Sequence, residues 1–238
     1  MILVSQHYTT GDPVRDDELR RAKLLNESCG LFEKCDYLDG DGGQLTFNEL
    51  FEHCGARYPG EKCVVANSDI AFHEAVGLED QIQSGKFVTL TRWEDSTGPN
   101  LIGHTFPHGK VTKRPDHFRW RLFSGCQDSW CFIGGEQPCL PMKAPTGITG
   151  VDQIIAASAA MAGLFVFNPC LSIRTYHLHE SMARGDRSAV CRGLYGYPEV
   201  CTSSNPQGWM AFHLWEGSSS VNSIKWTFGQ CQQLRCKN

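Results

Sequence analysis

One short apolar run constrains the fold more than any other part of this sequence. Residues 63–66 (Cys-Val-Val-Ala) are apolar without alternation, and the triplet Asn67-Ser68-Asp69 follows directly. A continuous apolar run of this length predicts a strand buried on both faces, as in the parallel sheets of α/β proteins. The polar triplet then falls at the carboxyl end of the strand, where open α/β sheets bind ligands.

Asn67 and Asp69 carry the oxygen ligands that Mg²⁺ and Mn²⁺ prefer. Residues i and i+2 of an extended segment point the same way, so we expect the amide oxygen and the carboxylate to converge on one cation. Such a cation commonly binds a phosphate as well, which leads to the hypothesis of a metal–diphosphate site. The structural alternative is a polar turn in which Asp69 caps the next helix.

Strand and helix signals alternate in the first half of the chain, which indicates a mainly parallel α/β sheet. Apolar, β-branched or aromatic runs predict strands over residues 2–5, 31–38, 63–66, 86–91 and 164–167. Capping residues and apolar faces predict helices that begin at Pro13 and that cover residues 47–54, 72–82 and 154–162. Residues 185–238 lack a clear period, and we expect them to form an extension packed on the same domain.

Composition restricts the partners and the compartment. The 238 residues carry a net charge of −4, and no basic stripe argues for nucleic acid as a partner. No apolar run approaches the ~20 residues that span a bilayer, so we expect no transmembrane segment. The N-terminus lacks the features of a signal peptide, and the 12 cysteines include no C-x-x-C pair. These features favour reduced thiols and a cytoplasmic location; the alternative is a disulfide among Cys191, Cys201, Cys231 and Cys236.

Further polar residues stand at the ends of predicted elements. Asp152 precedes the apolar helix, where it suits either an N-cap or a functional carboxylate. His177 and His179 have the spacing that places two imidazoles on one side of a strand, but two histidines alone are a weak zinc signal. Arg92 is suited to bind phosphate or to pair with Glu94.

Five short motifs occur in order along the chain: residues 66–70 (Ala-Asn-Ser-Asp-Ile), 90–94 (Leu-Thr-Arg-Trp-Glu), 127–132 (Gln-Asp-Ser-Trp-Cys-Phe), 150–152 (Gly-Val-Asp), and 168–169 (Asn-Pro) with 177–179 (His-Leu-His). In this order they resemble nucleotide-sugar glycosyltransferases of the GT-A fold, and in particular small members with an Asn-Ser-Asp-Ile form of the Asp-x-Asp motif. The resemblance covers residues 1–184. It implies a Rossmann-like sheet and the transfer of a sugar from a nucleoside-diphosphate donor to a glycan or glycosylated acceptor. Among such donors it favours uridine-linked ones.

The resemblance also implies roles for individual residues. Asn67 and Asp69 match the motif that binds Mn²⁺ or Mg²⁺ and the diphosphate, with Ser68 between them, and His177 or His179 matches a further metal ligand. Asp152 matches the catalytic base of inverting members, where this chain has Val-Asp-Gln in place of the usual Glu-Asp or Cys-Asp-Asn. The remaining matched residues meet the donor or the acceptor: Asp128 and Trp130 at the sugar, Arg92 at the phosphate, and Gln6, His7, Tyr8 and Thr10 at the nucleoside.

Two other classes of function remain open from the sequence. A non-catalytic nucleotide-sugar or glycan-binding protein would explain the altered first residue of the Asp-x-Asp motif. A metal-dependent hydrolase would use Asp69 together with His177 and His179. Inversion is favoured over retention because Asp152 is placed well for a base, and retention stays open.

Overall fold

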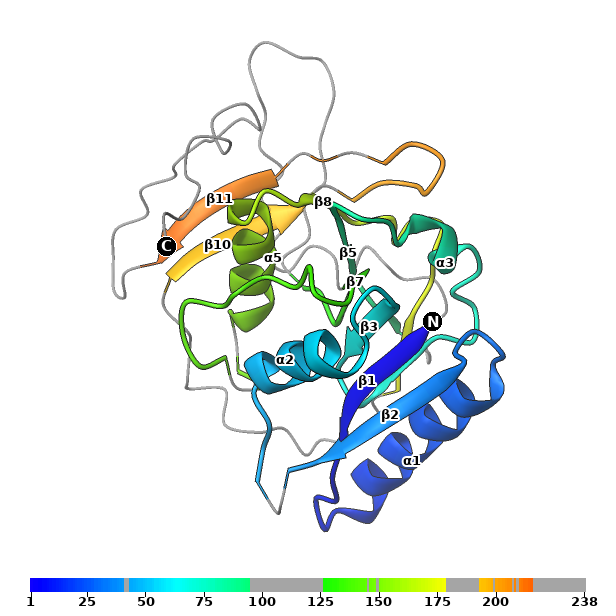
Figure 1. Cartoon of the computed structure of the whole chain (residues 1–238). Coiled ribbons are helices and arrows are strands. Elements are labelled where there is room, and N and C mark those ends of the chain that lie inside the picture. The colour runs from blue at the N-terminus through cyan, green and yellow to red at the C-terminus, as the bar shows by residue number, and fades with distance from the viewer. Residues whose placement is uncertain are drawn as a thin grey trace.

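The computed structural model describes residues 1–40, 43–94, 126–144, 146–148, 150–178, 193–198, 200–206, 208 and 210–215. A six-stranded sheet flanked by helices forms its centre, which confirms the α/β class (Figure 1). The strand order is β2-β1-β3-β7-β5-β8. The six strands are β1 (Ile2–His7), β2 (Lys34–Asp39), β3 (Lys62–Ala66), β5 (Lys86–Leu90), β7 (Ser129–Ile133) and β8 (Phe165–Phe167).

The sheet is mixed, with parallel pairs on both sides of one reversed strand. β1 runs parallel to β2 and to β3, and β5 runs parallel to β8. β7 lies between β3 and β5 and is antiparallel to both. The amino end of β7 therefore meets the carboxyl ends of β3 and β5, which brings residues from three strands to one edge.

Local sequence signals explain where the helices begin. α1 (Pro13–Ser28) starts at the N-cap Asp12, whose side chain accepts hydrogen bonds from two backbone amides of the first turn. α2 (Phe47–Arg57) starts with a capping box in which Thr46 and Glu49 satisfy each other's backbone amides. α5 (Val151–Met161) follows Gly150, whose φ of 94° suits glycine.

Alternation along the strands divides the core between the two faces of the sheet. Ile2, Val4, Val65 and Trp130 face one side, where they pack against α2 and α5. The intervening residues face the other side, where they pack against α3 (Leu78–Gln81) and a second, smaller sheet. Both faces of the central strands are thus buried, as the continuous apolar run at residues 63–66 predicted.

The second sheet has the order β4-β9-β6 and joins segments that lie far apart in the chain. Its strands are β4 (Ile70–Ala71), β6 (Trp93–Glu94) and β9 (Tyr176–His177). The predicted helix over residues 72–82 was wrong except for the four residues of α3. Buried Phe72 and Ala75 sit in successive turns instead: the Ala75 amide donates to the Phe72 carbonyl, and the Leu78 amide donates to the Ala75 carbonyl.

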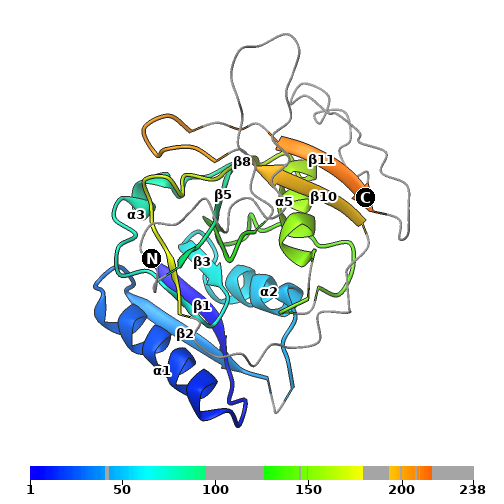
Figure 2. The same ribbon diagram turned by 180° about the vertical axis from the view of Figure 1, so that it is seen from behind.

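The C-terminal part of the described chain forms a hairpin of β10 (Gly193–Pro198) and β11 (Met210–Trp215). The hairpin lies beside α5 in both views, at the end of the molecule opposite α1 and β2 (Figures 1 and 2). A Cβ on Gly196 would come within 2.8 Å of the Ala157 backbone nitrogen, so β10 approaches α5 closely. In the part of the chain that the structure describes, no helix is long and apolar enough to cross a membrane.

Candidate functional site

The Asn-Ser-Asp segment forms a turn between the two sheets. The amide of Ile70 donates to the carbonyl of Asn67 at 3.2 Å, and Ile70 already belongs to β4. The segment is therefore not extended, and the expectation that Asn67 and Asp69 point the same way was wrong. Asn67 contacts Asp128, whereas Asp69 contacts residues of α1 and β9.

Asn67 belongs to a group that we call the Asp128 cluster: Asn67, Arg92, Asp128 and Asp152. Asn67 Nδ2 donates to Asp128 Oδ1 at 2.9 Å, and Arg92 Nη1 donates to the same oxygen at 2.6 Å. Asp128 is 3% exposed, and backbone bonds from Asn67 to Asp128 and from Asp128 to Leu90 continue the sheet beyond β7. Asp128 is thus held at the edge where the carboxyl ends of β3 and β5 meet the start of β7.

Asp152 approaches this cluster from the first turn of α5. Burial raises the pKa of Asp152 to about 8, and the nearby negative charge of Asp128 contributes in the same direction. The charge of Arg92 and a hydrogen bond with the backbone of Gln127 oppose the rise in pKa. Asp152 is therefore mostly protonated at neutral pH, whereas an exposed aspartate would be ionised.

A second group, which we call the Asp69 cluster, consists of Arg15, Glu18, Asp69 and His177. Arg15 bridges two acids: its Nη2 donates to Asp69 at 2.6 Å and its Nη1 donates to Glu18 at 2.7 Å. His177 Nε2 lies 3.0 Å from the same Asp69 oxygen, Oδ2. The pairing of β4 with β9 brings these residues together, because it places Ile70 opposite His177.

The Asp69 cluster keeps its carboxylate ionised. Burial alone would raise the pKa of Asp69, but the hydrogen bond from His177 and the charges of His177 and Arg15 hold it well below its usual range. Burial likewise opposes the charge of Arg15, and the two acids outweigh that effect, so the Arg15 pKa is raised. This is a buried ion-pair network that ties α1 to the turn after β3 and to β9.

The predicted nucleoside-binding residues lie near the end of β1. Gln6 is buried, donates to Gly43 and accepts from the amide of Leu45, and so it holds the loop before α2. Ser68 Oγ donates to the Gln6 carbonyl at 2.7 Å.

Residues further along this loop are more open. Thr10 is bonded to Asp16 in the first turn of α1. The ring of His7 lies edge-on to Tyr37, and Tyr8 is 37% exposed.

Trp130 is fully buried among Phe47, Phe51 and other rings of the core, and its predicted contact with a sugar stays a prediction. It points to the opposite face of β7 from its neighbour Cys131 and fills the space under α2. His179 lies outside the described residues. Arg92 was predicted to bind phosphate or to pair with Glu94; it pairs with Asp128, and the side chain of Glu94 lies outside the described residues.

The described residues fit a metal ion only in part. Asp69 and His177 are in contact and both can ligate a cation, but Asn67 is turned toward Asp128. Among the described residues no three His, Cys, Asp or Glu side chains are grouped so that they could hold a metal ion. A cation at Asp69 would also share the carboxylate with the positive charge of Arg15.

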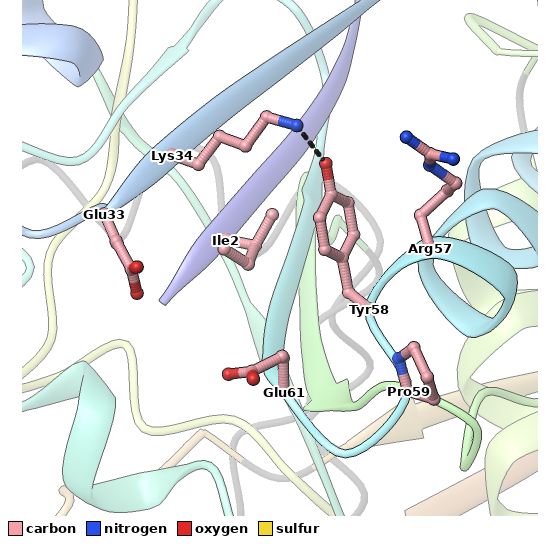
Figure 3. Close-up of a pocket in the computed structure, with 7 residues that line it drawn as sticks. All are labelled: Ile2, Glu33, Lys34, Arg57, Tyr58, Pro59 and Glu61. Atoms are coloured by element: carbon pink, nitrogen blue, oxygen red, sulfur yellow. Dashed lines mark hydrogen bonds between the residues drawn. The ribbon is translucent and has the colours of Figure 1, made fainter.

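The described structure contains a pocket of about 490 Å³ at the other edge of the sheet (Figure 3). Its lining includes Ile2 and Lys34, which begin β1 and β2, and Glu61, which precedes β3. Lys34 points to the hydroxyl of Tyr58, and the two are hydrogen-bonded at 2.6 Å (Figure 3). This pocket lies at the amino ends of the parallel strands, away from both clusters.

The sequence interpretation missed Arg15 and Glu18. A signal was present, because Glu18, Ala22 and Asn26 recur every four residues and all three are buried on α1. A charged residue on a buried helix stripe indicates a buried partner. The identity of the partner, Asp69, depends on a contact across 54 residues that no local pattern encodes.

Comparison with known proteins adds no relative: no protein-family model matches the chain, and no curated protein matches its sequence. The class that the structure defines is therefore an α/β protein with two polar clusters beside the carboxyl end of β3.

Proposed function

We propose that this protein is a glycosyltransferase of the GT-A type that moves a sugar from a nucleoside-diphosphate donor, preferably a uridine one, to a glycan or glycosylated acceptor. The observation that carries the proposal is the meeting of Asp128 and Asp152 with Arg92 at the edge formed by β3, β5 and β7. Open α/β sheets bind ligands at such an edge. The five sequence motifs support the same class.

Asp152 is the proposed base. Transfer with inversion requires removal of a proton from the acceptor hydroxyl, and a carboxylate at hydrogen-bond distance performs that step. A raised pKa makes the Asp152 carboxylate a stronger base than an exposed aspartate, and its ionised fraction grows as the pH approaches 8. Arg92 supplies a positive charge near the negatively charged groups of the donor.

We further propose that Mn²⁺ or Mg²⁺ takes part, with Asp69 and His177 as its protein ligands and His179 as a third. When bound, the cation would neutralise charge on the diphosphate leaving group. Asp69 is ionised and in contact with His177, which supports this assignment. Arg15 places a competing positive charge on the same carboxylate, so Arg15 would share the task of balancing the donor's charge.

The cytoplasm is the proposed location. Cys54, Cys63, Cys131 and Cys170 are buried in the core as free thiols. Buried thiols of this kind suit a reducing compartment.

The deciding experiment is a screen of nucleotide sugars for donor hydrolysis and for binding by titration calorimetry, with and without Mn²⁺. We expect binding of a nucleoside diphosphate that Mn²⁺ strengthens, and slow release of the sugar to water. Binding of nucleotide sugars without turnover on any glycan panel would favour the non-catalytic binding protein. Binding of Zn²⁺ without any nucleotide would favour the hydrolase and reject the transferase.

A further inference from the structure

The two oxygens of the Asp128 carboxylate have different surroundings. Oδ1 accepts one hydrogen bond from Asn67 Nδ2 at 2.9 Å and one from Arg92 Nη1 at 2.6 Å. Oδ2 is buried, and no residue that the structure describes donates a hydrogen bond to it. One oxygen is therefore fixed by the protein while the other has an unused acceptor position.

An unused acceptor on a buried carboxylate is unfavourable, because the oxygen has lost water without gaining a donor. Buried polar atoms of this kind call for a ligand or an ordered water as partner. Asp152 lies close enough for the two carboxyls to interact through their charges, and no described residue is hydrogen-bonded to Oδ2.

We propose that Asn67 and Arg92 hold Asp128 so that its Oδ2 accepts a hydrogen bond from a sugar hydroxyl, and that Asn67 is a positioning residue for Asp128 and not a metal ligand. The inference deepens the proposed function and rests on it for the source of the sugar. A hydroxyl satisfies Oδ2 because it donates one hydrogen bond and needs no compensating charge. The sugar is either that of the nucleotide donor or that of the acceptor.

The proposal explains why position 67 holds an amide. An aspartate there would lose the donor that now contacts Asp128 Oδ1 and would place a second negative charge beside it. Asn67→Asp restores the Asp-x-Asp pattern, so a role as metal ligand predicts tighter Mn²⁺ binding in this variant. A positioning role predicts instead that Asn67→Asp weakens recognition of the sugar.

The test compares the wild type with Asn67→Asp and Asp128→Asn by titration calorimetry in Mn²⁺, with UDP, UDP-glucose, UDP-galactose and UDP-N-acetylglucosamine as probes. We expect the preferred UDP-sugar to lose about tenfold in affinity in both variants while UDP itself changes less than about twofold. A retained preference for the UDP-sugar together with tighter Mn²⁺ binding in Asn67→Asp would overturn the proposal.

A matched control is available in α2. Asn48→Asp adds the same charge, but Asn48 uses its Oδ1 to accept from the Ala144 amide, and an aspartate keeps that acceptor. We expect Asn48→Asp to bind every probe as the wild type does. Thermal unfolding of all variants checks that a lost affinity reflects the site and not the fold.

Binding of free saccharides distinguishes a hydroxyl of the donor sugar from a hydroxyl of the acceptor sugar. It also tests the hydroxyl site when the protein is not a glycosyltransferase. Saturation-transfer NMR with glucose, galactose, N-acetylglucosamine and lactose is measured on the wild type and on Asp128→Asn. An acceptor sugar is assigned if Asp128→Asn loses saccharide binding and keeps the UDP-sugar preference. If the wild type binds no nucleotide, the transferase is rejected, and saccharide binding that depends on Asp128 still supports the hydroxyl site. A wild type that binds neither UDP-sugars nor saccharides overturns the inference.

Discussion

At the scale of single residues, the two clusters use opposite electrostatics. Asp152 is a carboxyl whose charged form is disfavoured by burial and by Asp128, whereas Asp69 is a carboxylate whose charged form is held by His177 and Arg15. Pairs of acids whose environments separate their pKa values are characteristic of acid–base sites.

If Asp152 is the catalytic base, the transfer rate depends on pH. Asp152 acts as a base only when ionised, so the transfer rate is expected to rise with pH up to about 8 and to level off above it. Asp152→Asn should lower the rate by at least about 100-fold at every pH and leave donor affinity unchanged. Rates measured from pH 5.5 to 9.5 with a saturating donor check both points, and normal transfer by the variant would place the base elsewhere.

The raised pKa of Asp152 also makes the stability of the fold depend on pH. Because the folded-state pKa of Asp152 is raised, the folded protein keeps a proton that the unfolded chain loses above pH 4, so the wild type loses stability as the pH rises to about 8. Asp152→Asn carries no charge and escapes this loss. We expect the variant to unfold at the wild-type temperature near pH 4 and on the order of 3 °C higher at pH 8.5. Equal midpoints at both pH values would contradict the raised pKa.

Asp69 predicts the opposite pH dependence. Its lowered pKa contributes stability that is present above pH 4 and is lost as the pH falls below it. Asp69→Ala leaves Arg15 buried with one partner fewer, and we expect a loss of about 3 kcal/mol in the free energy of unfolding at pH 7. Denaturant titration measures this loss.

The control for Asp69→Ala is Asp17→Ala on α1, the helix that carries Arg15. Asp17 pairs with Arg20 at the surface, where both side chains are about half exposed, and such a pair is worth less than about 1 kcal/mol. Similar losses in the two variants would show that burial of the Asp69 cluster adds nothing.

At the scale of elements, local signals decide where helices begin. Thr46 and Glu49 form the capping box of α2, and the Phe47 that follows packs on Trp130 in the core. Thr46→Ala removes a capping bond at this end and should cost about 1 kcal/mol of stability, while Thr46→Ser should cost little. Denaturant unfolding of the three proteins measures the difference, and equal losses from Ala and Ser would implicate the methyl group instead of the hydroxyl.

At the scale of the whole molecule, the β10–β11 hairpin packs on α5, the helix that carries Asp152. Gly196 has no room for a Cβ against the Ala157 backbone, so Gly196→Ala should push β10 away and lower stability by about 1–3 kcal/mol. We expect one cooperative transition, shifted equally by circular dichroism and by tryptophan fluorescence. An unshifted transition would show that the hairpin contributes nothing to the stability of the sheet.

Much of the fold could be predicted from sequence because its signals are local. The apolar run at residues 63–66 predicted β3, Asp12-Pro13 predicted the start of α1, and Thr46 predicted the start of α2. Each of these three predictions depends on side chains that lie within about four residues of one another in the sequence. The reversed direction of β7 and the pairing of β4 with β9 were not predicted, because they join segments more than 60 residues apart.

The sequence alone determined that a buried strand ends in Asn67-Ser68-Asp69 and that Asp152 opens a helix. Only the tertiary structure decided that Asn67 turns to Asp128, that Asp69 turns to Arg15 and His177, and that Trp130 belongs to the core. The physical reason is that hydrophobic periodicity depends on neighbours along the chain. The partner of a charged side chain depends instead on which strands the completed sheet places side by side.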